Sequence, residues 1–439
     1  MQRSRRYFGL ALVFGFIAAP GFESQLPVAQ QTPVRSLAPA AHPASSEDFA
    51  QWRTRIRQAL FIDDPLPALT PKSFGSFSPT PGVIAERVTY GTGYGMRVPA
   101  IVYRSSEAGK HRPGLVIVNG HSGDKSSWYA YYSGILYAKA GAVVVTYDPV
   151  GEYERNSGRN SDTKAHDTIV PGTEMPQRMG GQMITDIMQA VGYLAQRADV
   201  DPARIGVAGY SMGSFHAAIA GALDSRIRAL ILSGGGNLDG PGGYWDSSSK
   251  VMCQAGPYHA IEFLPDRGAV LYALNQRRGP TFIINGMVDP LVVAPHTLEP
   301  FFEDLRDRTA ALTGTRVGLF ETYWIPEAGH RPNFVTRPAA LWMNDQLHFP
   351  NWSDASIRNL GEAHISDWAA QTGALIGQGF QKEVSEGGVR ALAAEIPSVP
   401  RDQLQAVPVD EWRRHKDDFV WEAWVERARN ASAAHQGSQ

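Results

Sequence analysis

Apolar runs and amphipathic segments alternate along most of the chain after residue 113. The apolar runs are continuous, which is typical of strands buried on both faces of a parallel sheet. The segments between them place apolar residues three or four positions apart, which indicates helices with one buried face. The predicted strands are 114–119, 142–147, 205–208, 229–233, 281–285 and 317–325, and the predicted helices are 128–140, 184–195, 215–223, 269–274, 298–312 and 333–347. This order predicts an α/β fold with a mostly parallel sheet flanked by helices on both faces.

The segments on either side of this alternation have a different pattern. A capped amphipathic helix is predicted to begin at Ser45, and two strands follow it at 83–90 and 96–103. After the alternation, helical segments carry recurring tryptophans at positions Trp368, Trp412, Trp421 and Trp424. We expect these tryptophans to form a docking surface, and contact with carbohydrate is the alternative. The predicted organisation is a signal peptide (1–25), a linker (26–45), an N-terminal helical extension (46–82), a central domain (83–347) and a C-terminal helical extension (348–439).

The N-terminal segment has the pattern of an export signal. Arg3, Arg5 and Arg6 precede an apolar stretch, 8–19, that is too short to span a bilayer comfortably. A retained membrane anchor is the alternative. Because no second long apolar run follows, we expect no stable membrane insertion after signal removal, and a periplasmic or secreted location.

Composition excludes several classes of function. The 439 residues carry a formal net charge of −2 without a long run of one sign, which argues against a nucleic-acid groove. Cys253 is the single cysteine, so no internal disulfide forms, and we expect it to be a small core residue. The histidines lack metal-ligand spacing and no phosphate-binding glycine loop is present. We therefore expect neither a metal nor a cofactor, and the oligomeric state stays open.

The chemistry is first indicated by the pentapeptide Gly209-Tyr210-Ser211-Met212-Gly213. It lies directly between the predicted strand 205–208 and the predicted helix 215–223, the context of a nucleophile elbow. Small residues are needed two positions before and after the serine because the turn is tight. The hydroxyl of Ser211 would then stand clear of the backbone at a helix N-terminus, where developing negative charge is favoured.

Two further residues follow predicted strands and complete a catalytic set. Asp289 follows the strand 281–285, and His330 follows the strand 317–325. A serine hydroxyl is a weak nucleophile until a base accepts its proton, and the base needs an acid to fix its tautomer. Ser211, His330 and Asp289 can supply the nucleophile, the base and the acid, and Asp239 is the alternative acid. His216 lies inside the helix after the elbow, where we expect a structural role.

The oxyanion requires two hydrogen-bond donors. One is expected from the backbone N–H of Met212, and the other from the loop after strand 114–119, with the His121 N–H first and Ser122 second. Two irregular segments, 156–181 and 234–265, either line the acyl pocket or pack over the edge of the sheet.

The stretch 83–347 resembles the α/β-hydrolase superfamily, and within it the acetyl xylan esterase and dienelactone-hydrolase-like group. The resemblance rests on segments 120–125, 147–152, 199–207, 286–290 and 328–330, together with Asp186, Tyr193 and Leu194. It implies an α/β-hydrolase fold and a serine esterase that hydrolyses carboxylic esters, with acetyl or short acyl esters of carbohydrates as substrates. Together with the N-terminal export signal, this predicts an exported serine esterase. The alternatives are a serine peptidase of the prolyl-oligopeptidase type and a non-catalytic binding protein of the same fold.

Overall fold

The computed structural model describes residues 43–437 except 108, 162–164, 168–169, 171–173, 240–250, 278, 290, 293–294, 327, 377–388 and 394. The predicted signal peptide and nearly all of the predicted linker lie outside the described residues. Among the described residues, no helix has both the length and the apolar character needed to cross a bilayer.

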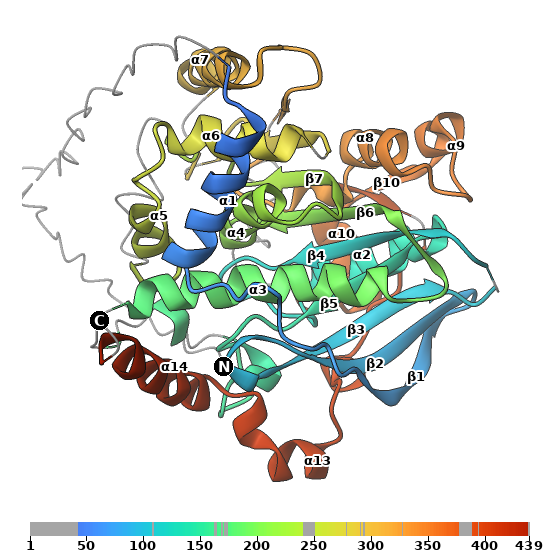
Figure 1. The fold of residues 1–439 in the computed structure, drawn as a ribbon. Coiled ribbons are helices and arrows are strands. Elements are labelled where there is room, and N and C mark those ends of the chain that lie inside the picture. Colours follow the sequence, from blue (N-terminus) through green and yellow to red (C-terminus); the bar gives the residue numbers. More distant parts are fainter. Residues whose placement is uncertain are drawn as a thin grey trace, which may run out of the picture. The chain divides into compact units, whose positions relative to one another are not determined.

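A nine-stranded sheet forms the centre of the described chain (Figure 1). Its order is β1-β2-β3-β5-β4-β6-β7-β8-β9. The last six strands in this order, β5-β4-β6-β7-β8-β9, run parallel to one another. The strands are β1 (Lys72–Thr80), β2 (Val83–Gly91), β3 (Arg97–Ser105), β4 (Arg112–Val118), β5 (Val143–Tyr147), β6 (Val200–Tyr210), β7 (Ile227–Ser233), β8 (Thr281–Gly286) and β9 (Glu321–Ile325). β1, β2 and β3 pair antiparallel at one edge. The predicted fold class, a mostly parallel sheet flanked by helices, is confirmed.

Strand β1 is an element that the sequence pattern did not reveal. It lies within the segment expected to be a helical extension, and it pairs with β2 at the edge of the sheet. Its register shifts between Ser73 and Ser76. That irregularity separates Phe74 and Phe77, which pack against the core, by three positions instead of two. The alternation that would have indicated a strand is therefore broken.

Side chains alternate between two cores on opposite faces of the sheet. In β4, Val116 and Val118 belong to one cluster, whereas Leu115 and Ile117 belong to the other. This explains why the strand is continuously apolar in sequence. The first cluster is covered by α1 (Ser46–Ala59), α3 (Met175–Ala195), α4 (Met212–Leu223), α6 (Arg267–Gln276) and α7 (Pro295–Thr313), and the second by α2 (Trp128–Lys139) and α8 (Arg337–Leu347). Figure 1 shows α3 crossing the front of the sheet.

The C-terminal extension packs onto the central domain along much of its length. It contains α9 (Asp354–Asn359), β10 (Gly361–His364), α10 (Ile365–Thr372), β11 (Arg390–Ala393), α13 (Val409–Arg414) and α14 (Trp421–Gln436). Trp368 and Trp412 are buried in the same cluster as α2, and Trp424 is fully buried in a third cluster with Met96 and Met212. Because the faces of these three tryptophans are covered by protein, they serve docking and not sugar stacking. The fourth, Trp421, is only partly buried and stacks on Trp424.

Candidate active site

The elbow places Ser211 between the end of β6 and the start of α4. Its backbone has φ 53° and ψ −118°, a conformation that costs free energy for any residue other than glycine. The two flanking glycines are needed for space. A Cβ on Gly209 would lie 2.5 Å from the Gly213 carbonyl oxygen, and one on Gly213 would lie 2.5 Å from the Asn119 carbonyl oxygen. The close approach of β6, α4 and the end of β4 thus explains the small-residue pattern of the motif.

The structure brings Ser211, His330 and Asp289 together in one hydrogen-bonded chain. The Ser211 Oγ lies 2.8 Å from His330 Nε2, and His330 Nδ1 lies 2.8 Å from Asp289 Oδ2. With the imidazole proton on Nδ1, the ring donates to Asp289 and accepts from the serine hydroxyl. This arrangement is the one that a general base needs in order to accept the proton of Ser211.

Hydrogen bonds and close backbone contacts hold both Asp289 and His330 in place. The other carboxylate oxygen of Asp289 accepts hydrogen bonds from the backbone N–H groups of Leu291 at 2.8 Å and Val292 at 3.2 Å. The loop carbonyl of His330 accepts from the Tyr210 hydroxyl at 2.9 Å. Gly234 comes so close to the imidazole that a Cβ there would lie 2.8 Å from His330 Cε1. The ring and the carboxylate are therefore fixed before any substrate binds.

The alternative acid, Asp239, lies in a different set of contacts. Its carboxylate accepts from the Tyr258 hydroxyl at 2.6 Å and from the Gly268 backbone N–H at 2.7 Å, and Arg267 lies 3.6 Å away. These contacts join the loop after β7 to the start of α6. The geometry consequently favours Asp289 as the acid.

The two expected oxyanion donors flank the serine. Met212 is the first residue of α4, directly after Ser211. The loop that carries His121 begins at Gly120, where a Cβ would lie 3.1 Å from Ser211 Cβ. Both backbone segments thus lie against the serine, and their roles as donors stay a prediction.

His216 and His166 are buried beside this region and stay neutral. Burial lowers the pKa of His216 to about 4 and the pKa of His166 to about 3. The ring of His216 lies 2.7 Å from the backbone oxygen of Cys253, which agrees with the structural role expected for it. Burial also raises the pKa of Glu152, 3.5 Å from His166, to about 9. This carboxyl group is therefore protonated at neutral pH.

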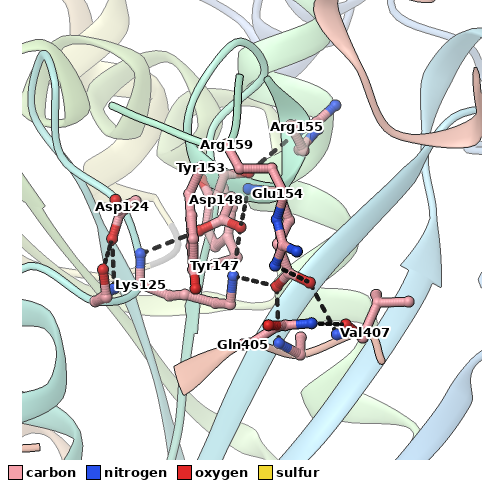
Figure 2. Close-up of polar contacts among 12 residues, drawn as sticks. Asp124, Lys125, Tyr147, Asp148, Tyr153, Glu154, Arg155, Arg159, Gln405 and Val407 are labelled. Atoms are coloured by element: carbon pink, nitrogen blue, oxygen red, sulfur yellow. Dashed lines mark hydrogen bonds and ion pairs between the residues drawn. The ribbon is translucent and has the colours of Figure 1, made fainter. Parts of the chain in front are cut away.

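A buried ionic cluster supports the loop after β4 (Figure 2). The fully buried ammonium of Lys125 pairs with Asp148 and lies 2.6 Å from Glu154. Burial alone would lower the pKa of Lys125, but the two carboxylates outweigh it and raise the pKa above its usual range. Lys125 therefore remains charged and joins the loop that carries His121 to the segment after β5.

The C-terminal extension completes this ionic cluster. The carboxylate of Glu154 accepts from the backbone N–H groups of Ala406 at 2.7 Å and Val407 at 2.9 Å. The Trp412 indole N–H donates to the Glu154 carbonyl at 2.7 Å. Figure 2 shows Glu154 between Lys125 and Val407. The extension is thus part of the support of the site, a role that the helical pattern of its sequence did not reveal.

Replacing Lys125 with methionine should destabilise the fold by about 3–5 kcal/mol, because two carboxylates then remain buried without their cation. The free energy of unfolding in urea measures this. Lys72→Met, at an exposed position at the start of β1, should change it by less than about 0.5 kcal/mol. A Lys125→Met variant as stable as the Lys72→Met control would show that the cluster does not depend on its ammonium.

The structure also joins residues that the sequence left apart. His121 Nε2 lies 3.3 Å from Cys253 Sγ and 3.0 Å from Asp167 Oδ1, so Cys253 is a buried residue with polar partners and not only a core residue. Asp167 and Cys253 come from the two segments predicted to be irregular, 156–181 and 234–265. That prediction is wrong for 175–181, where α3 begins, and for 251–260, which is helical. In their described parts, both segments therefore reach the loop beside the nucleophile. Histidine spacing could not predict this group, because its members come from three distant parts of the chain.

Comparison with known proteins supports the same fold. The profile of the acetyl xylan esterase family matches residues 41–233, and that of the prolyl oligopeptidase family matches residues 173–351. The solved structure of methylesterase BT1017 superposes with a TM-score of 0.58 at 19% identity, covering 90% of this chain and 78% of that one. The chain is an α/β-hydrolase by fold. Both matched families consist of hydrolytic enzymes, so the predicted resemblance and the prediction of an enzyme are confirmed.

Two further relatives of this α/β-hydrolase are more distant or match over less of the chain. The curated protein YtaP of Bacillus subtilis (strain 168) is 45% identical over 53 residues, which is 12% of this chain and 18% of that protein. Acetyl xylan esterase 1 from Thermoanaerobacterium sp. JW/SL YS485 has a TM-score of 0.46 at 18% identity, covering 72% of this chain and 96% of that one. The matched stretch spans less than a fifth of YtaP, so activity has to be argued from the site itself.

Proposed function

We propose that this α/β-hydrolase is a serine esterase that cleaves carboxylic esters through an acyl-serine intermediate. The observation that carries the proposal is the chain of two 2.8 Å hydrogen bonds from Ser211 through His330 to Asp289. A non-catalytic binding protein would have no use for a strained serine held against a base, so the geometry disfavours that alternative.

The first half of the reaction forms the acyl-enzyme. The Ser211 oxygen attacks the ester carbonyl carbon while His330 Nε2 accepts the hydroxyl proton. Asp289 stabilises the imidazolium that results. The backbone N–H groups of Met212 and His121 would hold the negative oxygen of the tetrahedral intermediate. When this intermediate collapses, the carbon–oxygen bond to the alcohol breaks and His330 returns the proton to the leaving alkoxide.

The second half releases the acid. His330 accepts a proton from a water molecule, whose oxygen attacks the acyl carbon of the ester on Ser211. The bond to the serine oxygen breaks, and that oxygen regains its proton from His330. No cofactor is required by this sequence of steps, since each proton moves between the substrate, the water and the imidazole.

The substrate class is inferred to be esters of carbohydrates with acetyl or another short acyl group. Its support is the acetyl xylan esterase match over residues 41–233, a stretch that includes Ser211. A peptidase is the second candidate, because the prolyl oligopeptidase match over residues 173–351 includes Ser211, Asp289 and His330. Within the described residues the strands form one nine-stranded and one two-stranded sheet, and a propeller domain is not among them.

A substrate panel tests the proposal. Purified protein should hydrolyse aryl acetates and acetylated xylan with a kcat/KM at least about 10²-fold above that for proline-containing peptide amides, because the nitrogen of an amide is a poorer leaving group than the oxygen of an ester and depends more strongly on proton transfer. Methyl esters of sugar acids and aryl esters of longer acids define the acyl and alcohol preferences. Turnover of the peptide amides without turnover of any ester would replace the esterase by the peptidase.

Export is proposed from the sequence pattern of residues 1–25. Expression of the full chain in a Gram-negative bacterium should yield a shortened protein in the periplasm or medium. Mass spectrometry gives its new N-terminus. A full-length product retained in the membrane fraction would instead indicate the anchor.

A further inference from the structure

A second cluster of reactive side chains includes His121, whose neighbour Gly120 lies against Ser211. His121 comes from the loop after β4, Asp167 from the 3-10 turn Ala165–Asp167, and Cys253 from the helical turn Val251–Ala255. Three of their atoms converge. His121 Nε2 to Asp167 Oδ1 is 3.0 Å, His121 Nε2 to Cys253 Sγ is 3.3 Å, and Cys253 Sγ to Asp167 Oδ1 is 3.4 Å.

The geometry differs from that of a catalytic relay. In the relay at Ser211, the two nitrogens of His330 serve two different partners, so a proton can pass through the ring. In the second cluster, the single nitrogen Nε2 of His121 faces both the thiol and the carboxylate. The thiol also faces the Asp167 carboxylate, at 3.4 Å, so the three atoms form a closed triangle and the second ring nitrogen of His121 takes no part in it. Convergence of a nitrogen, a sulfur and an oxygen on one point is instead the arrangement of ligands around a metal ion.

The distances fit a tetrahedral site closely. Zinc bonds to nitrogen and oxygen are about 2.0–2.2 Å and to sulfur about 2.3 Å, which places neighbouring ligand atoms about 3.3–3.6 Å apart. The three observed separations of 3.0, 3.3 and 3.4 Å need to open by only about 0.1–0.4 Å. Rotation of the side chains about their χ angles is sufficient for such a movement.

The surroundings suit a site with an open position. Cys253 is fully buried, whereas the side chains of His121 and Asp167 are 14% and 12% exposed. The cluster is therefore partly accessible to solvent, which could supply a fourth ligand. The ring of His216 lies 2.7 Å from the backbone oxygen of Cys253 and fixes the turn that presents the thiol.

We propose that His121, Asp167 and Cys253 bind one divalent transition-metal ion, with zinc as the best match. A thiolate and a carboxylate supply two negative charges to a dipositive ion, and imidazole is the commonest neutral ligand. The thiolate excludes calcium and magnesium, which take oxygen ligands. Because Gly120 lies against Ser211, a metal on His121 would also hold the loop next to the nucleophile. The proposal concerns binding and stands whether or not the chain is an esterase.

Cobalt is the direct probe, because a cobalt–thiolate bond produces a charge-transfer absorption in the near ultraviolet. Protein dialysed against a chelator should bind one equivalent of Co²⁺ with this absorption, and one equivalent of Zn²⁺ should displace it. Cys253→Ser should lose the absorption and bind at least about 100-fold more weakly, more than the loss of an outer partner typically costs. Asp167→Asn and His121→Gln should each weaken binding by at least about tenfold.

A matched control separates this site from adventitious binding. His415 is exposed at the end of α13, and His415→Gln should leave both the absorption and the affinity unchanged. Circular dichroism of each variant confirms that it is folded. Absence of the absorption in wild-type protein, or stoichiometric binding that survives Cys253→Ser, would overturn the proposal and leave a cluster joined by protons alone.

Discussion

Replacing Ser211 with alanine should lower kcat for ester hydrolysis by about 10⁶-fold, and His330→Ala should lower it by a similar factor. The two residues act as one unit, since the hydroxyl is reactive only while the imidazole 2.8 Å away accepts its proton. The double variant should therefore be no less active than either single variant. A residual acceleration of about 10³-fold over water should remain, because the oxyanion donors and substrate binding are retained.

Covalent labelling and steady-state kinetics together check this prediction. A fluorophosphonate should label the wild-type protein and the control Ser225→Ala, whose serine is exposed just beyond α4, and it should not label Ser211→Ala. The kinetics should show a loss in kcat with little change in KM. Labelling that persists in Ser211→Ala would place the nucleophile elsewhere and would remove the basis of the proposed function.

The central sheet could be predicted because its strands are apolar on both faces. In β4, alternate residues enter opposite cores, and each therefore has to be apolar. Edge strands lack that requirement. β1 is largely exposed and bulged, and the short strands β10 and β11 form a separate two-stranded sheet, so neither region has a clear hydrophobic periodicity.

The three residues of the candidate triad could be located for a related reason. Parallel strands end at the same edge of the sheet, so Ser211 after β6, Asp289 after β8 and His330 after β9 had to come near one another. Which loop residue turns inward is then a local matter of turn geometry. The closeness of Gly234 and Gly286 to the loop of His330 shows how much backbone shape decides this.

The contacts that support the site could not be predicted in this way. Glu154 receives hydrogen bonds from residues 252 and 253 positions later in the chain, and His121 meets Cys253 across 132 positions. These pairings depend on how irregular segments fold back over the sheet. Irregular segments have no periodicity, so the sequence alone carries no signal for their partners. The same reasoning explains why spacing rules for metal ligands, which describe local motifs, did not reveal the His121 cluster.

Asp289→Asn should lower kcat by about 10⁴-fold, because an amide can donate its own proton to His330 Nδ1 and so favour the tautomer that cannot accept from Ser211. The backbone N–H groups of Leu291 and Val292 can still bind the amide oxygen, so the loop should keep its shape. The effect should therefore appear in kcat and leave the midpoint of thermal unfolding nearly unchanged.

The matched variant is Asp239→Asn, at the alternative acid. Asp239 bonds to Tyr258 and Gly268 and not to His330, so its replacement should weaken the packing of α6 and lower the unfolding temperature while kcat stays within a few-fold of wild type. Measuring kcat and thermal unfolding for both variants separates the two roles. If Asp239→Asn loses turnover and Asp289→Asn keeps it, the acid is Asp239 and the hydrogen bond between Asp289 and His330 is structural. Because each variant replaces one carboxylate by its isosteric amide, size and shape are constant, and the difference between them reports only on which carboxylate orients the base.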